Sequence, residues 1–225
     1  DMSGLKGRTS LPEGFMRGCT ALEEVLLPPV VSNMMGRRCF ENCTSLKRMD
    51  LSGLLLRIVP EGFMDGCSAL EEVVLPHSVQ VLECCFNRCS SLKRIDLRGL
   101  RQLSSMYGFA CDCTALEEVL LSPSLSEIGP CFQNCTSLRS LDMSELHRVA
   151  FGNAFMMGCT HLEEVLLPAK VVSVGDDFLA NCRSLVRIDV TPLQDAKPRG
   201  ARLMVGCEGL PSETKAVVAM MSASA

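Results

Sequence analysis

The sequence of 225 residues contains no tryptophan and only one tyrosine, so its core depends on aliphatic side chains and nine phenylalanines. No apolar run approaches the ~18 residues that a membrane-spanning helix needs, and the first residues lack the charged-then-apolar layout of a signal peptide. The net charge of −4 shows no excess of Lys and Arg, which argues against nucleic acid or an acidic membrane as a partner. With 47% hydrophobic and 21% charged residues, the chain is still expected to fold.

Sequence motifs of catalysis are missing as well. The chain contains no GxSxG, P-loop, GxGxxG or HExxH motif, and no CxxC pair at the spacing of a zinc site. A Glu-Glu pair recurs at regular intervals, whereas a catalytic pair of carboxylates is normally unique. We therefore predict that the chain is not an enzyme and carries no cofactor or metal.

What the sequence does contain is an internal repeat of 22 to 24 residues. The string Cys-[Thr/Ser/Arg]-x-Leu starts at Cys19, Cys43, Cys67, Cys89, Cys113, Cys135, Cys159 and Cys182, with a degenerate ninth copy at Cys207. Each of the first eight copies continues as L-x-x-φ-x-φ, where φ is apolar, and the alternation of the last positions predicts a strand. We expect eight parallel strands in one continuous sheet, at residues 25–27, 49–51, 73–75, 95–97, 119–121, 141–143, 165–167 and 188–190.

The remainder of each repeat has its own pattern. A turn signal follows the strand, and a short apolar patch such as Val79/Val81 or Val171/Val174 predicts a second, shorter strand. A Phe then stands three or four residues before the next Cys, which is the spacing of one helical turn. Eight of the nine Phe residues are thereby expected to form one buried column.

Residues 116–143, LEEVLLSPSLSEIGPCFQNCTSLRSLDM, follow the frame LxxIxLPxxLxxIGxxAFxxCxSL. Over about residues 10–193 the chain thus resembles the BspA-like leucine-rich repeats, also called the Treponema pallidum type. The resemblance implies a binding protein without catalysis. It also implies the setting of the family, in which many members are surface or secreted adhesins and antigens.

The predicted fold is an α/β repeat, a right-handed leucine-rich-repeat solenoid. Its parallel strands are expected on the concave face, with short turns, and second short strands or single helical turns on the convex side. Residues 1–193 are assigned to the repeats and residues 194–225 to a degenerate last coil with a C-terminal cap. The opening DMSGL matches the strand end Asp50–Leu54, which suggests a segment of a longer array. The exposed N-terminal coil is then expected to self-associate.

Outward strand positions predict charged columns in which the sign alternates from coil to coil. One column contains Glu23, Lys47, Glu71, Lys93, Glu117, Arg139, Glu163 and Val186. Such a ladder fixes how the coils stack, because like charges directly opposite each other are destabilising; a patterned partner surface is the alternative. The alternation fails near the C-terminal end, where apolar residues also face outward. The candidate partner-binding residues are Leu120, Ser140, His161, Leu166, Val186 and Arg187.

The 14 cysteines complete the predictions. Nine of them occupy one position of the repeat, where Cys acts as a small buried hydrophobic residue. Reduced thiols favour the cytoplasm, whereas disulfides would favour the cell surface or secretion. The leading hypothesis is a scaffold that binds an unknown protein partner. The alternatives are a surface adhesin or antigen and the targeting arm of a larger enzyme.

Overall fold

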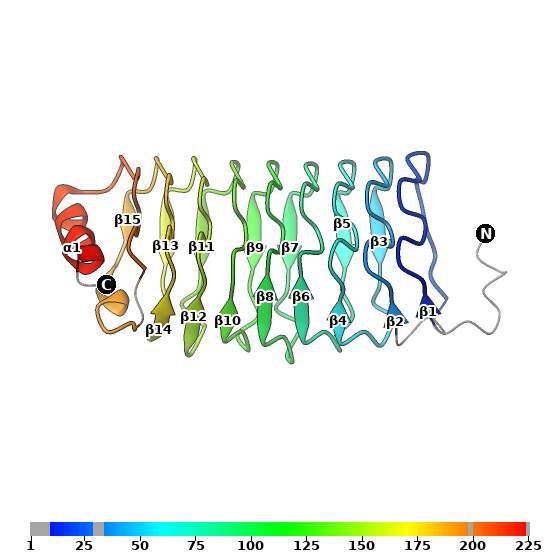
Figure 1. Ribbon diagram of the computed structural model, residues 1–225, viewed down its shortest axis with the longest axis horizontal. Helices are drawn as coiled ribbons and strands as arrows, with labels where there is room; N and C mark the ends of the chain where they lie inside the picture. Colours follow the sequence, from blue (N-terminus) through cyan, green and yellow to red (C-terminus); the bar gives the residue numbers. More distant parts are fainter. Residues whose placement is uncertain (1–9, 29–33, 198–199, 224–225) are drawn as a thin grey trace.

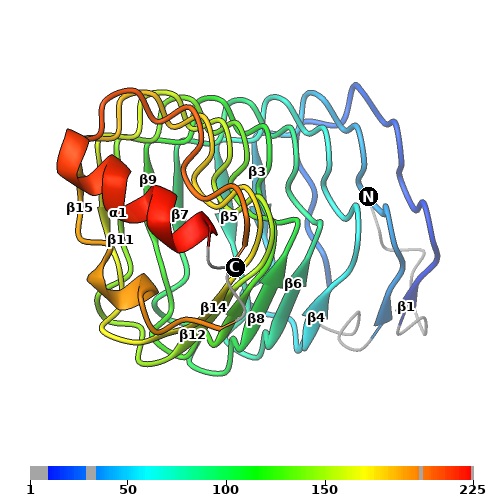
Figure 2. The same ribbon diagram turned by 60° about the vertical axis from the view of Figure 1, so that its left-hand side comes forward.

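The computed structural model describes residues 10–28, 34–197 and 200–223, which wind into a row of stacked coils (Figure 1). The opening DMSGL, from which a longer array was inferred, lies outside the described residues. Two sets of parallel strands run along two sides of the row, as the turned view shows (Figure 2). Their apolar side chains meet between the two sets in one core that runs along the stack.

One set forms a continuous six-stranded sheet, here called the second sheet. Its strands are β4 (Ile58–Val59), β6 (Val81–Glu83), β8 (Ser105–Tyr107), β10 (Glu127–Ile128), β12 (Val149–Phe151) and β14 (Val171–Val174). Leu82, Met106 and Ile128 are register partners and are buried, so one side chain of each strand fills the core. The prediction of short second strands is confirmed. A further pair, β1 (Ser10–Leu11) and β2 (Met34–Met35), lies at the N-terminal end.

The other set contains the strands that follow each repeat Leu. They are β3 (Arg48–Asp50), β5 (Glu72–Val74), β7 (Arg94–Asp96), β9 (Glu118–Leu120), β11 (Ser140–Asp142), β13 (Glu164–Leu166) and β15 (Arg187–Ile188). All seven start one residue before the predicted position, and all pair in parallel. The predicted first strand at residues 25–27 is wrong, because residues 22–28 form no strand.

The prediction of one continuous sheet is also wrong. Hydrogen bonding joins these strands in three blocks, β3–β5, β7–β9 and β11–β13–β15. Strands within a block start 24 or 23 residues apart, as Arg48 and Glu72 do, whereas β5 and β7 start 22 apart, at Glu72 and Arg94. The same 22-residue step separates β9 from β11. The interruptions therefore coincide with the shorter coils.

The columns of Phe and Cys lie where the repeat predicts. The Phe residues from Phe40 to Phe178 are fully buried, and successive rings pack edge to face over most of the column. Each buried repeat Cys donates its S–H to a carbonyl of the preceding coil, as Cys67 does to Phe40 O at 3.1 Å and Cys113 to Phe86 O at 3.1 Å. Phe15 and Cys19, in the first coil, are only partly buried.

The predicted helical turn between Phe and Cys is not formed. The residue before the repeat Cys has a positive φ in every coil: Gly18, Asn42, Gly66, Arg88, Asp112, Asn134, Gly158, Asn181 and Gly206. A left-handed residue is incompatible with an α-helical turn, and Gly, Asn and Asp adopt it most easily. A Cβ added at Gly66 would in addition overlap Asn42 Oδ1 of the neighbouring coil.

Helix is confined to the C-terminal end of the described chain. A 3₁₀ turn occupies Thr191–Leu193, and α1 (Ser212–Ala223) lies across the last coil with Val218 and Met221 buried (Figure 2). The α/β part of the prediction is therefore not confirmed. Within the described residues, no helix has both the length and the hydrophobicity to cross a membrane.

Candidate interaction surface

The outward side of the seven repeat strands forms one surface, here called the charged strand face. In β3 and β7 the outer residues are exposed while the central Met49 and Ile95 are buried, as strand alternation requires. The outward positions carry the Arg, Asp and Glu residues of the predicted columns. The surface is therefore charged along its length and rests directly on the apolar core.

Ion pairs on this face join strands of the same block. Their members are Arg48–Glu72, Arg94–Glu118, Arg139–Glu163 and Arg187–Glu164, at 3.3, 2.6, 2.6 and 3.0 Å. The predicted ladder of alternating charges is therefore not continuous in its ion pairs. Within residues 34–197, no ion pair crosses from β5 to β7 or from β9 to β11. Each Arg therefore has one Glu partner, on the neighbouring coil of the same block.

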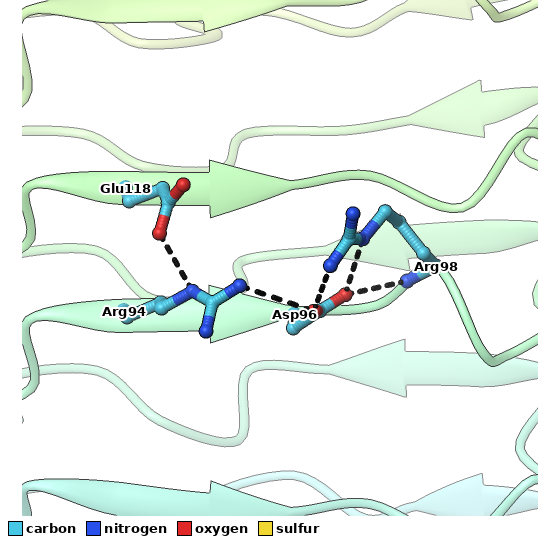
Figure 3. A network of polar contacts seen from close by, with 4 residues as sticks. All are labelled: Arg94, Asp96, Arg98 and Glu118. Carbon is cyan, nitrogen blue, oxygen red and sulfur yellow. Dashed lines mark hydrogen bonds and ion pairs between the residues drawn. The ribbon is translucent and has the colours of Figure 1, made fainter.

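A polar network on β7 and β9 shows how these side chains are held (Figure 3). Arg94 Nε lies 2.6 Å from Glu118 Oε2, and its Nη2 lies 3.4 Å from Asp96 Oδ2. Arg98 donates to Asp96 through its backbone N–H and through Nε and Nη2. These bonds from Arg98 hold the pKa of Asp96 below its ordinary value. Asp96 thus stays ionised and orients both guanidinium groups, which suits binding rather than proton transfer.

Five of the six candidate residues lie together on the block β11–β13–β15. Ser140 and Arg187 flank Glu164 in register on neighbouring strands, and Leu166 and Val186 expose 45% and 42% of their surface. His161 precedes β13. The sixth residue, Leu120, ends β9 beyond an interruption and is half-buried.

His161 is tied to the neighbouring coil. Its Nδ1 lies 2.7 Å from the carbonyl oxygen of Thr136, and its side chain lines a shallow pocket with Glu117 and Arg139. Arg187 is also engaged, because Nε and Nη2 both donate to the carboxylate of Glu164. Both side chains are exposed but fixed in place, so a partner would meet preset positions rather than mobile groups.

The structure adds two grooves that were not predicted from the sequence. One, of about 670 Å³, lies at the interruption between β5 and β7 and is lined by Glu72, Arg94 and Asp96. The other, of about 640 Å³, follows the ends of β13 and β15. The first had a signal in the sequence, the 22-residue step. The second depends on residues that are separated along the chain and meet only through stacking.

Most of the cysteines are shielded from solvent. All 14 are free thiols; 11 are buried and Cys19, Cys84 and Cys111 are partly exposed. Burial raises the pKa of the Cys67 and Cys111 thiols to about 12, so little reactive thiolate is present near neutral pH. The described residues contain no group of three or more His, Cys, Asp or Glu that could hold a metal ion.

Comparison with known proteins agrees with this architecture. The profile of the BspA type leucine-rich repeat region matches residues 6–106 and 57–186, in six copies. A solved leucine-rich repeat protein from T. pallidum, TpLRR, is 23% identical with a TM-score of 0.56, over 82% of this chain and 74% of that one. At this identity the likeness shows a shared fold.

Two further solved structures are similar at a lower level. A leucine-rich repeat protein from Bacteroides ovatus is 22% identical with a TM-score of 0.35, over 93% of this chain and 84% of its own. A leucine-rich cell surface protein from Faecalibacterium prausnitzii is 17% identical with a TM-score of 0.32, over 80% and 69%. No curated protein matches the chain.

Proposed function

The chain belongs to the family of BspA type leucine-rich repeat proteins, and on that premise we propose that it is a non-enzymatic scaffold that binds a protein partner. One observation carries the proposal: an exposed face of seven strands presents side chains in fixed register within each of three hydrogen-bonded blocks. Because the second sheet is continuous from β4 to β14, the coils beneath this face are held together. Such a face offers a partner a rigid, extended surface.

We place the partner contact on the block β11–β13–β15. It is the largest hydrogen-bonded block of the face, and it combines two exposed apolar side chains, Leu166 and Val186, with the guanidinium of Arg187. Arg is enriched among the residues that contribute most to binding, and burial of the two exposed apolar side chains would add to the affinity. Ser140 and His161 would contact the partner at the margin, and Leu120 would extend the contact toward β9.

The test compares two double variants in capturing proteins from an extract of the source organism. L166R/V186E alters the proposed contact. I58R/V205E places the same new side chains on residues of similar exposure, 49% and 55%, away from this block. We expect certain proteins to be captured by both wild type and I58R/V205E. The same proteins should not be captured by L166R/V186E. The purified partner should then bind L166R/V186E at least about tenfold more weakly.

Two outcomes would contradict the proposed contact. The first is capture of the same proteins by wild type and L166R/V186E, which would remove the partner from this block. The second is an equal loss in both double variants, which would assign the effect to a general change of the surface. Circular dichroism of each variant confirms that it has folded before capture is measured.

Other predictions are kept as proposals. We propose that residues 194–225 close the end of the repeats, which is supported by the burial of Val218 and Met221 of α1.

The two alternative functions, a surface adhesin and the targeting arm of a larger enzyme, would use the same face and differ in what is attached to it. Self-association through the N-terminal coil stays a proposal, supported by the exposed Leu26, at 77%, and by the two-residue strand β1 at that end, whereas residues 22–28 form no strand. A cytoplasmic location stays a prediction from the free thiols.

A further inference from the structure

A groove of about 640 Å³ lies where the chain passes from the charged strand face to the second sheet. Three cations line it, and each comes from a different coil: Arg148 before β12, Lys170 before β14, and Lys197 after the 3₁₀ turn. All three are exposed, and none of them has an ion pair within 4.0 Å in the described part of the chain. The groove thus gathers three cations that have no ion-pair partner.

This arrangement is unlike the rest of the molecule. On the charged strand face the sign alternates from coil to coil, whereas here three successive coils contribute the same sign. Backbone bonds bring the three coils together, because Val149 N donates to Lys170 O and Lys197 N donates to Val172 O. Like charges on adjacent strands are destabilising, so this group is more stable with an anion between its members.

The positive stack is confined to the C-terminal coils. Further toward the N-terminus, the coils enter the second sheet at Arg57, Gln80, Ser104 and Ser126, which are joined by backbone hydrogen bonds from coil to coil. Only the first of these four is a cation, so no second stack of like charges forms there and the fold itself needs none. The three cations are therefore better explained by a ligand than by the stacking of the coils.

The lining also limits what the ligand is. Val172 and Pro192 give the groove apolar surface, and Asp189 and Asp195 add two carboxylates. The backbone N–H of Thr191 donates to Asp189 Oδ1 at 2.9 Å, which fixes that carboxylate at the rim. A densely charged polyanion would be repelled by these two groups. A segment with a few carboxylates and some apolar side chains suits all of these features.

We propose that this groove binds an acidic, extended peptide segment of a partner protein, an inference that rests on the proposed scaffold function and names the chemistry of its partner. Carboxylates of the segment would pair with Arg148, Lys170 and Lys197, and an apolar side chain between them would pack on Val172 and Pro192. Side chains on one face of an extended chain repeat every ~6.6 Å, and stacked coils every ~4.8 Å. Long Lys and Arg side chains can make up the difference between these two spacings. We therefore expect the acidic residues of the bound segment to be two positions apart in its sequence.

The test uses the full chain and a fluorescein-labelled peptide, Glu-Val-Glu-Leu-Glu, followed by fluorescence anisotropy. The groove variant is R148E/K170E/K197E. The matched control, K47E/K93E/R101E, makes the same charge change at three exposed cations that also lack ion pairs and lie outside the groove. We expect the groove variant to bind the peptide at least about tenfold more weakly and the control within about threefold. Salt should weaken wild-type binding.

Equal weakening in both variants would overturn the inference, because general attraction would then explain binding. Heparin or inorganic phosphate that binds wild type more tightly than the peptide does, and is lost in the groove variant, would overturn it in favour of a polyanion. Failure of the scaffold function is seen separately, through the natural partner and L166R/V186E. If only the groove variant loses binding of the peptide while L166R/V186E still binds the natural partner, the groove proposal is supported and the proposed contact on β11–β13–β15 is contradicted.

Discussion

The two sets of strands differ in how continuous they are. The second sheet pairs without interruption from β4 to β14, although its strands have only two to four residues. The repeat strands carry the clearest sequence pattern, yet they are hydrogen-bonded only in three blocks. Ion pairs on the charged strand face follow the blocks. The comparison teaches that a side-chain pattern fixes which residues point into the core, whereas backbone pairing depends on the path of each coil.

The largest expected effect is a difference in stability loss between two Leu→Ala substitutions, one in the continuous second sheet and one at an interruption of the charged strand face. Leu82 on β6 is fully buried, and Leu120 at the end of β9 is half-buried on the charged strand face. We expect Leu82→Ala to lower the free energy of unfolding by about 3 kcal/mol, since it removes buried methyl groups and leaves a cavity. Leu120→Ala should cost less than about 1 kcal/mol. Urea denaturation of both variants measures the difference, and equal losses would contradict the account.

A smaller effect is expected from reversing a charge within a block. Glu118→Lys replaces the 2.6 Å contact with Arg94 by a repulsion, while the neighbouring Ser140 offers no compensation. We predict a loss of about 0.5–1 kcal/mol in the free energy of unfolding at low salt, and a smaller loss at high salt because exposed charges are screened.

The matched control for this substitution is Glu71→Lys. Glu71 is exposed and has no ion pair in the described structure, so the same charge change should cost less than about 0.3 kcal/mol. A loss for Glu118→Lys that is unchanged by salt, or matched by Glu71→Lys, would remove the electrostatic explanation.

Much of the fold followed from side-chain periodicity. The burial of Phe109 and Cys113 and the positions of seven repeat strands were predicted, because spacing alone determines which side chains share a face. The turns were not, although the Gly or Asn before most repeat Cys residues is a signal of left-handed backbone. Residues 25–27 have the same apolar pattern as the other repeat strands, so the sequence does not indicate that a strand is absent there.

The candidate surface was only partly predictable. Leu166 and Val186 were identified because they break a regular column, and the structure places them on one hydrogen-bonded block. The groove around Arg148, Lys170 and Lys197 was missed, because only Arg148 and Lys170 share a repeat position, 22 residues apart, and Lys197 lies 27 residues further on, outside the regular repeats. Their proximity follows from how the links between the two sheets stack.

Amide hydrogen exchange tests the difference between the two sheets most directly. Neighbouring residues of a parallel strand direct their backbone groups to opposite sides, and Leu97 N bonds to Leu120 O of β9, so Arg94 and Asp96 direct their N–H groups toward the interruption. On the other side of the same coils, Gly129 N bonds to Met106 O within the second sheet.

We predict that the amides of Arg94 and Asp96 exchange at least about a hundredfold faster than those of Gly129 and Leu97. Equal protection of all four amides would contradict the central claim, because the charged strand face would then be as continuous as the second sheet.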